Sequence, residues 1–195
     1  MRSWRILLLL CLLIASVDFG TIASFASPFV VFPKASELVS PDGRFAVRSI
    51  ENTGAKSEFV GTFRSLWLYE LATGRSRKLC DYMGVASAAW SGNDFIIVTQ
   101  YVGKRTSRAL VFSVAPQDPV MIDGGTLIRL VPAELREPLR NNDHVFVEGA
   151  QVEQGTLHLT VWGYGSHDPN GFRYRCEYAL GEGTISCIEE HGSAK

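Results

Sequence analysis

The chain has 195 residues, 46% of them hydrophobic, and a formal net charge of −1 at pH 7. This length corresponds to a single domain with a tail at most. Affinity for nucleic acid depends on clustered positive charge, and no block of like charge stands out in this sequence, so nucleic acid is not expected as a partner.

The N-terminus has the features of a secretory signal peptide. Two arginines flank an apolar run at residues 6–17, and small residues follow in "TIASFAS". We predict cleavage after Ala26, so that residues 1–26 are a leader and residues 27–195 form one domain exported to the periplasm or the medium. The apolar run is short for a bilayer span, but an uncleaved N-terminal anchor is the alternative.

The rest of the chain consists of short apolar runs separated by turns. "SPDG" (40–43) and "HDPNG" (167–171) have proline and glycine where a type I turn selects them. The runs between turns are rich in aromatic and β-branched residues and are predicted to be strands. They cover 45–50, 65–71, 94–102, 108–114, 144–149, 156–164 and 172–180.

Several of these strands alternate in polarity, which is typical of a half-buried antiparallel sheet. Leu157 and Leu159, for example, share one face, and His158 points to the other. Residues 131–143 break this pattern with helix formers after a proline, and a second proline predicts one helical turn or a looped insertion there. "DGG" (123–125) is interpreted as a turn. The predicted fold class is all-β, built of antiparallel meanders.

Three cysteines lie beyond the predicted leader. Cys176 and Cys187 flank "EYALGEGTIS", which predicts a hairpin. If Ala179 pairs with Thr184, the two cysteines face each other on neighbouring strands and can form a disulfide. A bridge involving Cys80 is the alternative, since connectivity does not follow from sequence alone.

A faint internal repeat organises the strands into three units, at about 37–80, 85–122 and 143–190. "SPDGRFAV" followed by "LWLYELATGRSRKL" resembles the WD40-like repeat of TolB and of the propellers of prolyl oligopeptidase-type enzymes. The resemblance covers about residues 39–114 and is degraded beyond them. It implies four-stranded sheets that stack as propeller blades.

The resemblance leaves the way in which the blades assemble open. Blades take about 40–45 residues, and propellers contain 4–8 of them. The alternatives are a four-bladed ring with one unrecognised blade, an open stack of three sheets, and a sandwich-like fold. An open stack would expose sheet edges, which proteins usually cover or pair.

The most aromatic and polar stretch is "WGYGSHDPNG" (162–171). Trp162 and Tyr164 lie two residues apart on one face, where they form either a binding platform for a sugar or peptide or part of the packing between sheets. Ser166, His167 and Asp168 are the residue types of a hydrolase triad, but neighbours in sequence do not converge as a triad requires. We therefore interpret this segment as a turn.

Sequence motifs for a cofactor or a metal are absent. His144, His158 and His167 have spacings that match no ligand motif. No glycine-rich phosphate loop opens a helix. We predict no catalytic, cofactor or metal site.

The sequence therefore predicts an exported, non-enzymatic binding module whose partner is a protein, a peptide or a surface polymer. The alternative is a small secreted hydrolase or lyase with its site on the loops near 141–144 and 162–171. That alternative requires at least two of the ionisable groups of His144, His158, His167 and Asp168 to converge in one cleft.

Overall fold

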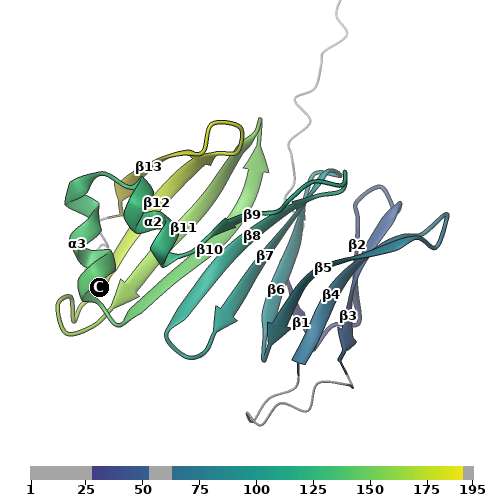
Figure 1. The fold of residues 1–195 in the computed structure, drawn as a ribbon, viewed down its shortest axis with the longest axis horizontal. Helices are drawn as coiled ribbons and strands as arrows, with labels where there is room; N and C mark the ends of the chain where they lie inside the picture. The colour runs from purple at the N-terminus through teal and green to yellow at the C-terminus, as the bar shows by residue number, and fades with distance from the viewer. Residues whose placement is uncertain (1–27, 53–62, 191–195) are drawn as a thin grey trace, which may run out of the picture.

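The computed structural model describes residues 28–52 and 63–190. These residues form two β-sheets and two short helices (Figure 1). The predicted leader and its cleavage site lie outside the described residues. No helix in the described ranges is both long and apolar enough to cross a membrane.

The strands form three antiparallel meanders that lie side by side in chain order (Figure 1). The first meander is a separate four-stranded sheet, and the other two belong to one nine-stranded sheet. The all-β class and the antiparallel meanders are thereby confirmed.

The first meander comprises β2 (Glu37–Val39), β3 (Phe45–Glu51), β4 (Phe63–Glu70) and β5 (Ser76–Met83). The second comprises β6 (Ala86–Ser91), β7 (Phe95–Val102), β8 (Thr106–Ser113) and β9 (Val120–Ile122), with β1 (Val30–Phe32) paired to β6. The third comprises β10 (His144–Glu153), β11 (Thr156–Tyr164), β12 (Phe172–Ala179) and β13 (Thr184–Glu189).

The "SPDG" turn opens the first meander through hydrogen bonds of its own side chains. The Ser40 hydroxyl donates to Asp42 at 2.7 Å, and the Phe45 amide donates to that hydroxyl at 2.9 Å. The Arg44 amide and guanidinium both donate to the Asp42 carboxylate. Gly43 takes the positive φ of 71° that lets the chain enter β3. The turn thus fixes where β3 begins.

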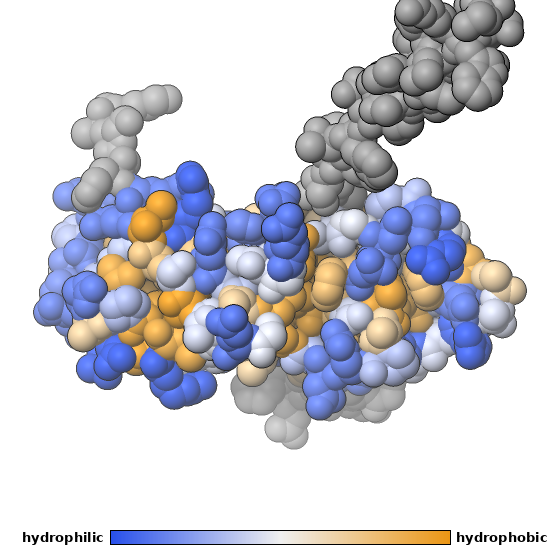
Figure 2. Space-filling view, turned by 90° about the horizontal axis from the view of Figure 1, so that it is seen from above, coloured by the Kyte–Doolittle hydropathy of each residue, from blue (hydrophilic) through white to orange (hydrophobic). Residues whose placement is uncertain are grey.

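Two hydrophobic cores lie between the meanders. The first core packs the first meander against β6–β8 around Trp90, and the second core packs β7 and β8 against the third meander. Because alternate residues of a strand point to opposite faces, Ile96 belongs to the first core and Ile97 to the second. Seen from above, hydrophobic surface runs between hydrophilic flanks along the length of the molecule (Figure 2).

β10 is attached to the second meander by a parallel pair, Val145 with Thr106, and by two serine side chains. The Ser107 hydroxyl accepts from the Val147 amide at 2.8 Å and donates to its carbonyl at 2.9 Å. Ser91 makes the same two bonds to Val152, at 2.8 and 2.9 Å. These hydroxyls take the place of backbone partners that β10 lacks, so they hold the third meander at two points in addition to the Val145–Thr106 pair.

The interpretation of residues 123–125 as a turn, and of 131–143 as one helical turn or a loop, was wrong. The chain forms α2 (Gly124–Leu130) and α3 (Ala133–Asn141). Asp123 caps α2 by accepting from the Thr126 amide at 2.7 Å. Leu127 and Leu139 are buried in the second core. Burial of these leucines stabilises helices that the local sequence, with its paired glycines and Pro138, disfavours.

The disulfide prediction is confirmed. Ala179 pairs with Thr184 and Cys176 pairs with Cys187, and the two cysteines are bonded with their Cα atoms 4.1 Å apart. Cys80 is a free thiol.

Candidate functional site

A cleft of about 270 Å³ lies where β4 and β5 of the first meander meet the β7–β8 hairpin of the second. It combines aromatic and aliphatic walls with three polar side chains, as small-ligand sites do. We call it the inter-sheet cleft. Its lining residues are Phe63, Asp81, Tyr82, Met83, Gln100, Tyr101, Val102, Gly103 and Arg108. A second cleft, of about 310 Å³, lies at the other end of β4 and includes Glu70 and Arg77.

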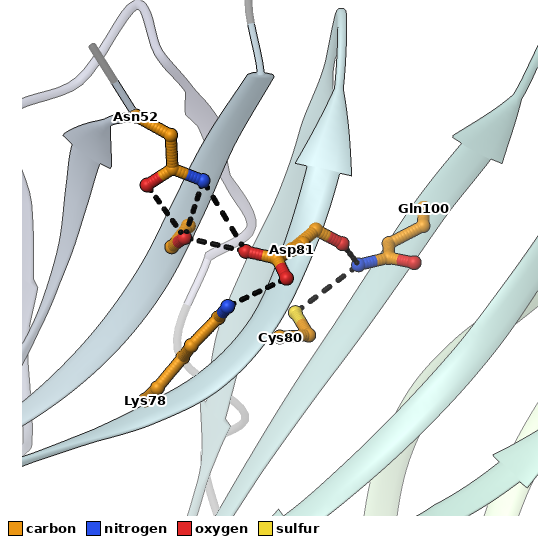
Figure 3. Close-up of polar contacts among 6 residues, drawn as sticks. Asn52, Lys78, Cys80, Asp81 and Gln100 are labelled. Carbon is orange, nitrogen blue, oxygen red and sulfur yellow. Dashed lines mark hydrogen bonds and ion pairs between the residues drawn. The ribbon is translucent and has the colours of Figure 1, made fainter. Parts of the chain in front are cut away.

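Asp81 is the centre of a polar network on the first-meander side of the inter-sheet cleft (Figure 3). Its carboxylate accepts from Lys78 at 2.6 Å, from the Ser65 hydroxyl at 2.5 Å and from Asn52 at 3.4 Å. Burial alone would raise the pKa of Asp81, but these hydrogen bonds lower it. The carboxylate is therefore ionised and has its own cation.

Gln100 connects the two meanders across the cleft. It is 2% exposed, and its amide nitrogen donates to the Asp81 carbonyl at 2.8 Å and to the Cys80 sulfur at 3.1 Å (Figure 3). Its amide oxygen accepts from Nε of Arg108 at 2.8 Å. A backbone carbonyl only accepts and a guanidinium only donates. The amide nitrogen of Gln100 must therefore face Asp81, and its amide oxygen must face Arg108. Arg108 is thereby held in one orientation.

Cys80 lies beside this network but is not a nucleophile at neutral pH. Burial raises the pKa of its thiol to about 12, against the lowering effect of the hydrogen bond from Gln100. The thiolate, which is the reactive form, is therefore not populated.

The sequence prediction singled out Trp162 and Tyr164, which lie on the face of the third meander that points away from the second core. Together with two residues of β10 they form what we call the aromatic ladder. Phe146 stacks on Trp162 with ring centroids 4.2 Å apart, and His144 stacks on Tyr164 at 4.3 Å. Both are directly opposed cross-strand pairs, the arrangement that stabilises antiparallel sheets.

Ring stacking reduces the flat aromatic surface that is open to a sugar. The planes within the pairs are inclined by only 9° and 23°, so each ring covers one face of its partner on the other strand. The same face of the meander continues to β13, where Ile188 pairs with Arg175 and is 65% exposed. Tyr164 is 43% exposed. We call this surface, from the aromatic ladder to Ile188, the outer face.

The loops near 141–144 and 162–171 do meet. Asn142 donates to the Asp168 carboxylate at 2.7 Å and accepts from the Asp168 amide at 3.1 Å. Asp168 also contacts His167 at 3.1 Å, and this bond raises the pKa of the His167 ring. His144 is instead stacked on Tyr164, and its buried Nδ1 has no hydrogen-bond partner among the described residues.

His158 lies towards the other end of β11, beside Glu153 and Glu177. The structure therefore brings together His167 and Asp168, which are neighbours in sequence, and separates His158 from them. Neither of the two clefts described above includes any of the four residues proposed for catalysis. Within residues 28–52 and 63–190, no group of three or more potential ligands is arranged to hold a metal ion.

The sequence analysis missed Gln100 and Arg108. The available signal was the period-2 pattern, which places both on the face of their strands that carries Ile96 and Leu110, where a polar residue requires a partner. Comparison with known proteins found no matching family model, curated protein or solved structure.

Proposed function

We propose that this protein is an exported, propeller-like binding module without catalytic activity, and that a protein partner packs on its outer face. The observation that carries the proposal is the exposure of Ile188 and Tyr164 on a sheet face that lies outside both cores. The faces between the meanders are covered by apolar contact with a neighbouring meander. The outer face combines the exposed Tyr164 and Ile188 with charged side chains such as Arg175, a mixed surface that another protein can cover.

The geometry of the rings favours a protein over a surface polymer. Sugars bind to open ring faces, whereas in the aromatic ladder one face of each ring is covered by its stacked partner. A protein surface contacts such rings with apolar side chains and can also reach Arg173 and Arg175, which lie on β12 between the ladder and β13 and are paired with Glu190. We therefore choose a folded protein or a peptide segment as the partner.

Export is supported by two independent features. The leader has the charge and hydropathy pattern of a signal peptide. The Cys176–Cys187 disulfide is of a kind that persists in oxidising compartments. The resemblance of the first two meanders to WD40-like repeats supports the propeller-like description.

Site-specific photo-crosslinking tests this proposal. Benzoylphenylalanine placed at Ile188 should crosslink one protein from an envelope extract, and Trp162→Ala should lower that yield several-fold. The matched control is Leu71, an exposed apolar residue after β4 of the first meander (42% exposed). Crosslinks of equal yield from both positions would contradict the proposal.

The product also identifies the partner. A crosslink between two copies of the chain, weakened by Trp162→Ala, would show that the partner is a second copy. Turnover of ester, peptide or glycoside substrates by the purified protein, abolished by His167→Ala, would contradict the absence of catalytic activity.

A further inference from the structure

We propose that the inter-sheet cleft is a second binding site, for a ligand that carries one carboxylate on a small apolar or aromatic body, and that Arg108 binds the carboxylate. This site lies between the first and second meanders and does not depend on the outer face or its partner.

Arg108 has hydrogen-bonding capacity left for a ligand. Its Nε donates to Gln100, and its Nη1 lies 3.6 Å from the Met121 sulfur, which is a weak acceptor. No carboxylate in the described part of the chain forms an ion pair with Arg108, whereas Arg44, Arg48 and Arg64, for example, each have one. The ion pairs of those three are with Asp42, Glu37 and Glu51. Arg108 is thus a partly buried guanidinium with free donors in a cleft.

The orientation of Arg108 is established before any ligand binds. Gln100 is buried, and its amide is tied to the backbone of Asp81 on the opposite meander. A guanidinium held in this way loses little side-chain entropy on binding, so more of the interaction energy with a carboxylate appears as affinity. We therefore regard Gln100 as a positioning residue for Arg108.

The charges of the cleft favour a single carboxylate over a phosphate or a dianion. Asp81 also lines the cleft and is ionised, because Lys78 and hydrogen bonds stabilise its charged form. Lys78 is already paired with Asp81 at 2.6 Å, which leaves Arg108 as the cation available to the ligand. A ligand with a second negative charge would be repelled by Asp81.

The walls of the cleft determine the rest of the ligand. Phe63, Met83 and Val102 are apolar, and the Tyr101 hydroxyl is occupied by a hydrogen bond to Glu148 at 3.2 Å, which leaves its ring as wall. A volume of about 270 Å³ lies below the usual range for drug-sized ligands. A phenylpropionate-like group or a C-terminal phenylalanine fits these requirements.

Calorimetry on the purified protein tests the proposal with four probes: 3-phenylpropionate, N-acetylphenylalanine, N-acetylphenylalanine amide and inorganic phosphate. We expect both carboxylates to bind more tightly than the neutral amide and phosphate. If N-acetylphenylalanine binds more tightly than 3-phenylpropionate, the natural source is the C-terminus of a peptide; the reverse order indicates a free organic acid.

Variants show whether Arg108 is responsible. A hydrogen bond between charged groups corresponds to a change of about tenfold or more in affinity, so Arg108→Gln should weaken carboxylate binding by that factor. Arg105→Gln, in the same hairpin, is the matched control and should change it less than about twofold. Arg108→Lys keeps the charge but not the planar guanidinium, and should be intermediate.

Two results would overturn the proposal: equal binding of N-acetylphenylalanine and its amide, or carboxylate binding unchanged in Arg108→Gln. If Arg108→Gln does not fold, Arg108→Lys decides, because unchanged affinity in that variant also overturns it. Neither result affects the crosslinking test of the outer face.

Discussion

Asp42 illustrates how a single residue of a turn contributes through its charge. Ser40 and Arg44 both donate to its carboxylate, and these hydrogen bonds lower its pKa from 3.8 to about 2. The carboxylate is at the surface, so solvent screens the interaction with the guanidinium and its net contribution to stability is small. The turn was predictable because all of its partners lie within five residues of one another.

Asp42→Asn should reveal this contribution as a function of pH. A carboxyl group whose folded pKa is below its unfolded value stabilises the folded state above the unfolded pKa of 3.8, and this effect is lost as the pH falls through about 2. The variant should therefore have a slightly lower urea midpoint than the wild type at neutral pH and the same midpoint near pH 2. Asp118→Asn, an exposed control, should not reproduce the pattern. A midpoint difference that persists undiminished at pH 2 would contradict this account.

Arg108 and Gln100 show the limit of prediction at the residue scale. Each stands in a predicted strand, and the sequence gives no indication that Gln100 reaches the backbone of Asp81 on another meander. That contact depends on how two sheets pack, whereas the pairing of Cys176 with Cys187 depends only on the register of one hairpin. Local register is encoded by alternation and turn position, and contacts between sheets are not.

At the scale of elements, the hairpin β12–β13 is stabilised by its disulfide. The bridge joins residues separated by 11 positions, and a loop of this length corresponds to about 3 kcal/mol of stabilisation through the unfolded chain. The double variant Cys176→Ala/Cys187→Ala should lower the free energy of unfolding by about that amount in urea titrations. Dithiothreitol should lower the wild type to the same level and leave the double variant unchanged. A wild type insensitive to the reductant would show that the bridge does not contribute.

The two helices were the elements that the sequence mispredicted. α2 begins with two glycines and α3 contains Pro138, and both features reduce helix propensity. Both segments are nevertheless helical because the second core buries one leucine of each, Leu127 of α2 and Leu139 of α3. Tertiary burial of this kind outweighs local preference, and it cannot be assessed before the sheets are placed.

At the scale of the whole molecule, the three meanders stack without closing. The larger sheet ends in β1 and β13, and the smaller one in β2 and β5. The sequence repeat predicted units at about 37–80, 85–122 and 143–190. The three meanders of the structure span Glu37–Met83, Ala86–Ile122 and His144–Glu189. The alternation and the turns made the meanders predictable, but the order and contacts of the stack depend on side chains from distant strands.

Ser91 and Ser107 are such side chains, and they determine how firmly the third meander is held. The Ser107 hydroxyl is the hydrogen-bond partner of both the amide and the carbonyl of Val147, and Ser107→Ala removes it. Leaving buried polar groups unpaired costs about 1–3 kcal/mol. We therefore expect Ser107→Ala to lower the free energy of unfolding by this amount and to accelerate hydrogen exchange at the Val147 amide. Ser91→Ala should have the corresponding effect at Val152.

Each of these variants serves as a control for the other, because the exchange of Val147 should respond to Ser107→Ala and much less to Ser91→Ala. Ser186→Ala, on the exposed strand β13, should alter neither amide. If both serine variants accelerate exchange at both amides to the same extent, β10 is held as one cooperative unit rather than at two separate points. If neither variant accelerates either amide, the hydroxyls do not secure the strand, and the Val145–Thr106 pair together with apolar packing, such as the contact of β10 with Ile97 at Gly149, holds the third meander on the second.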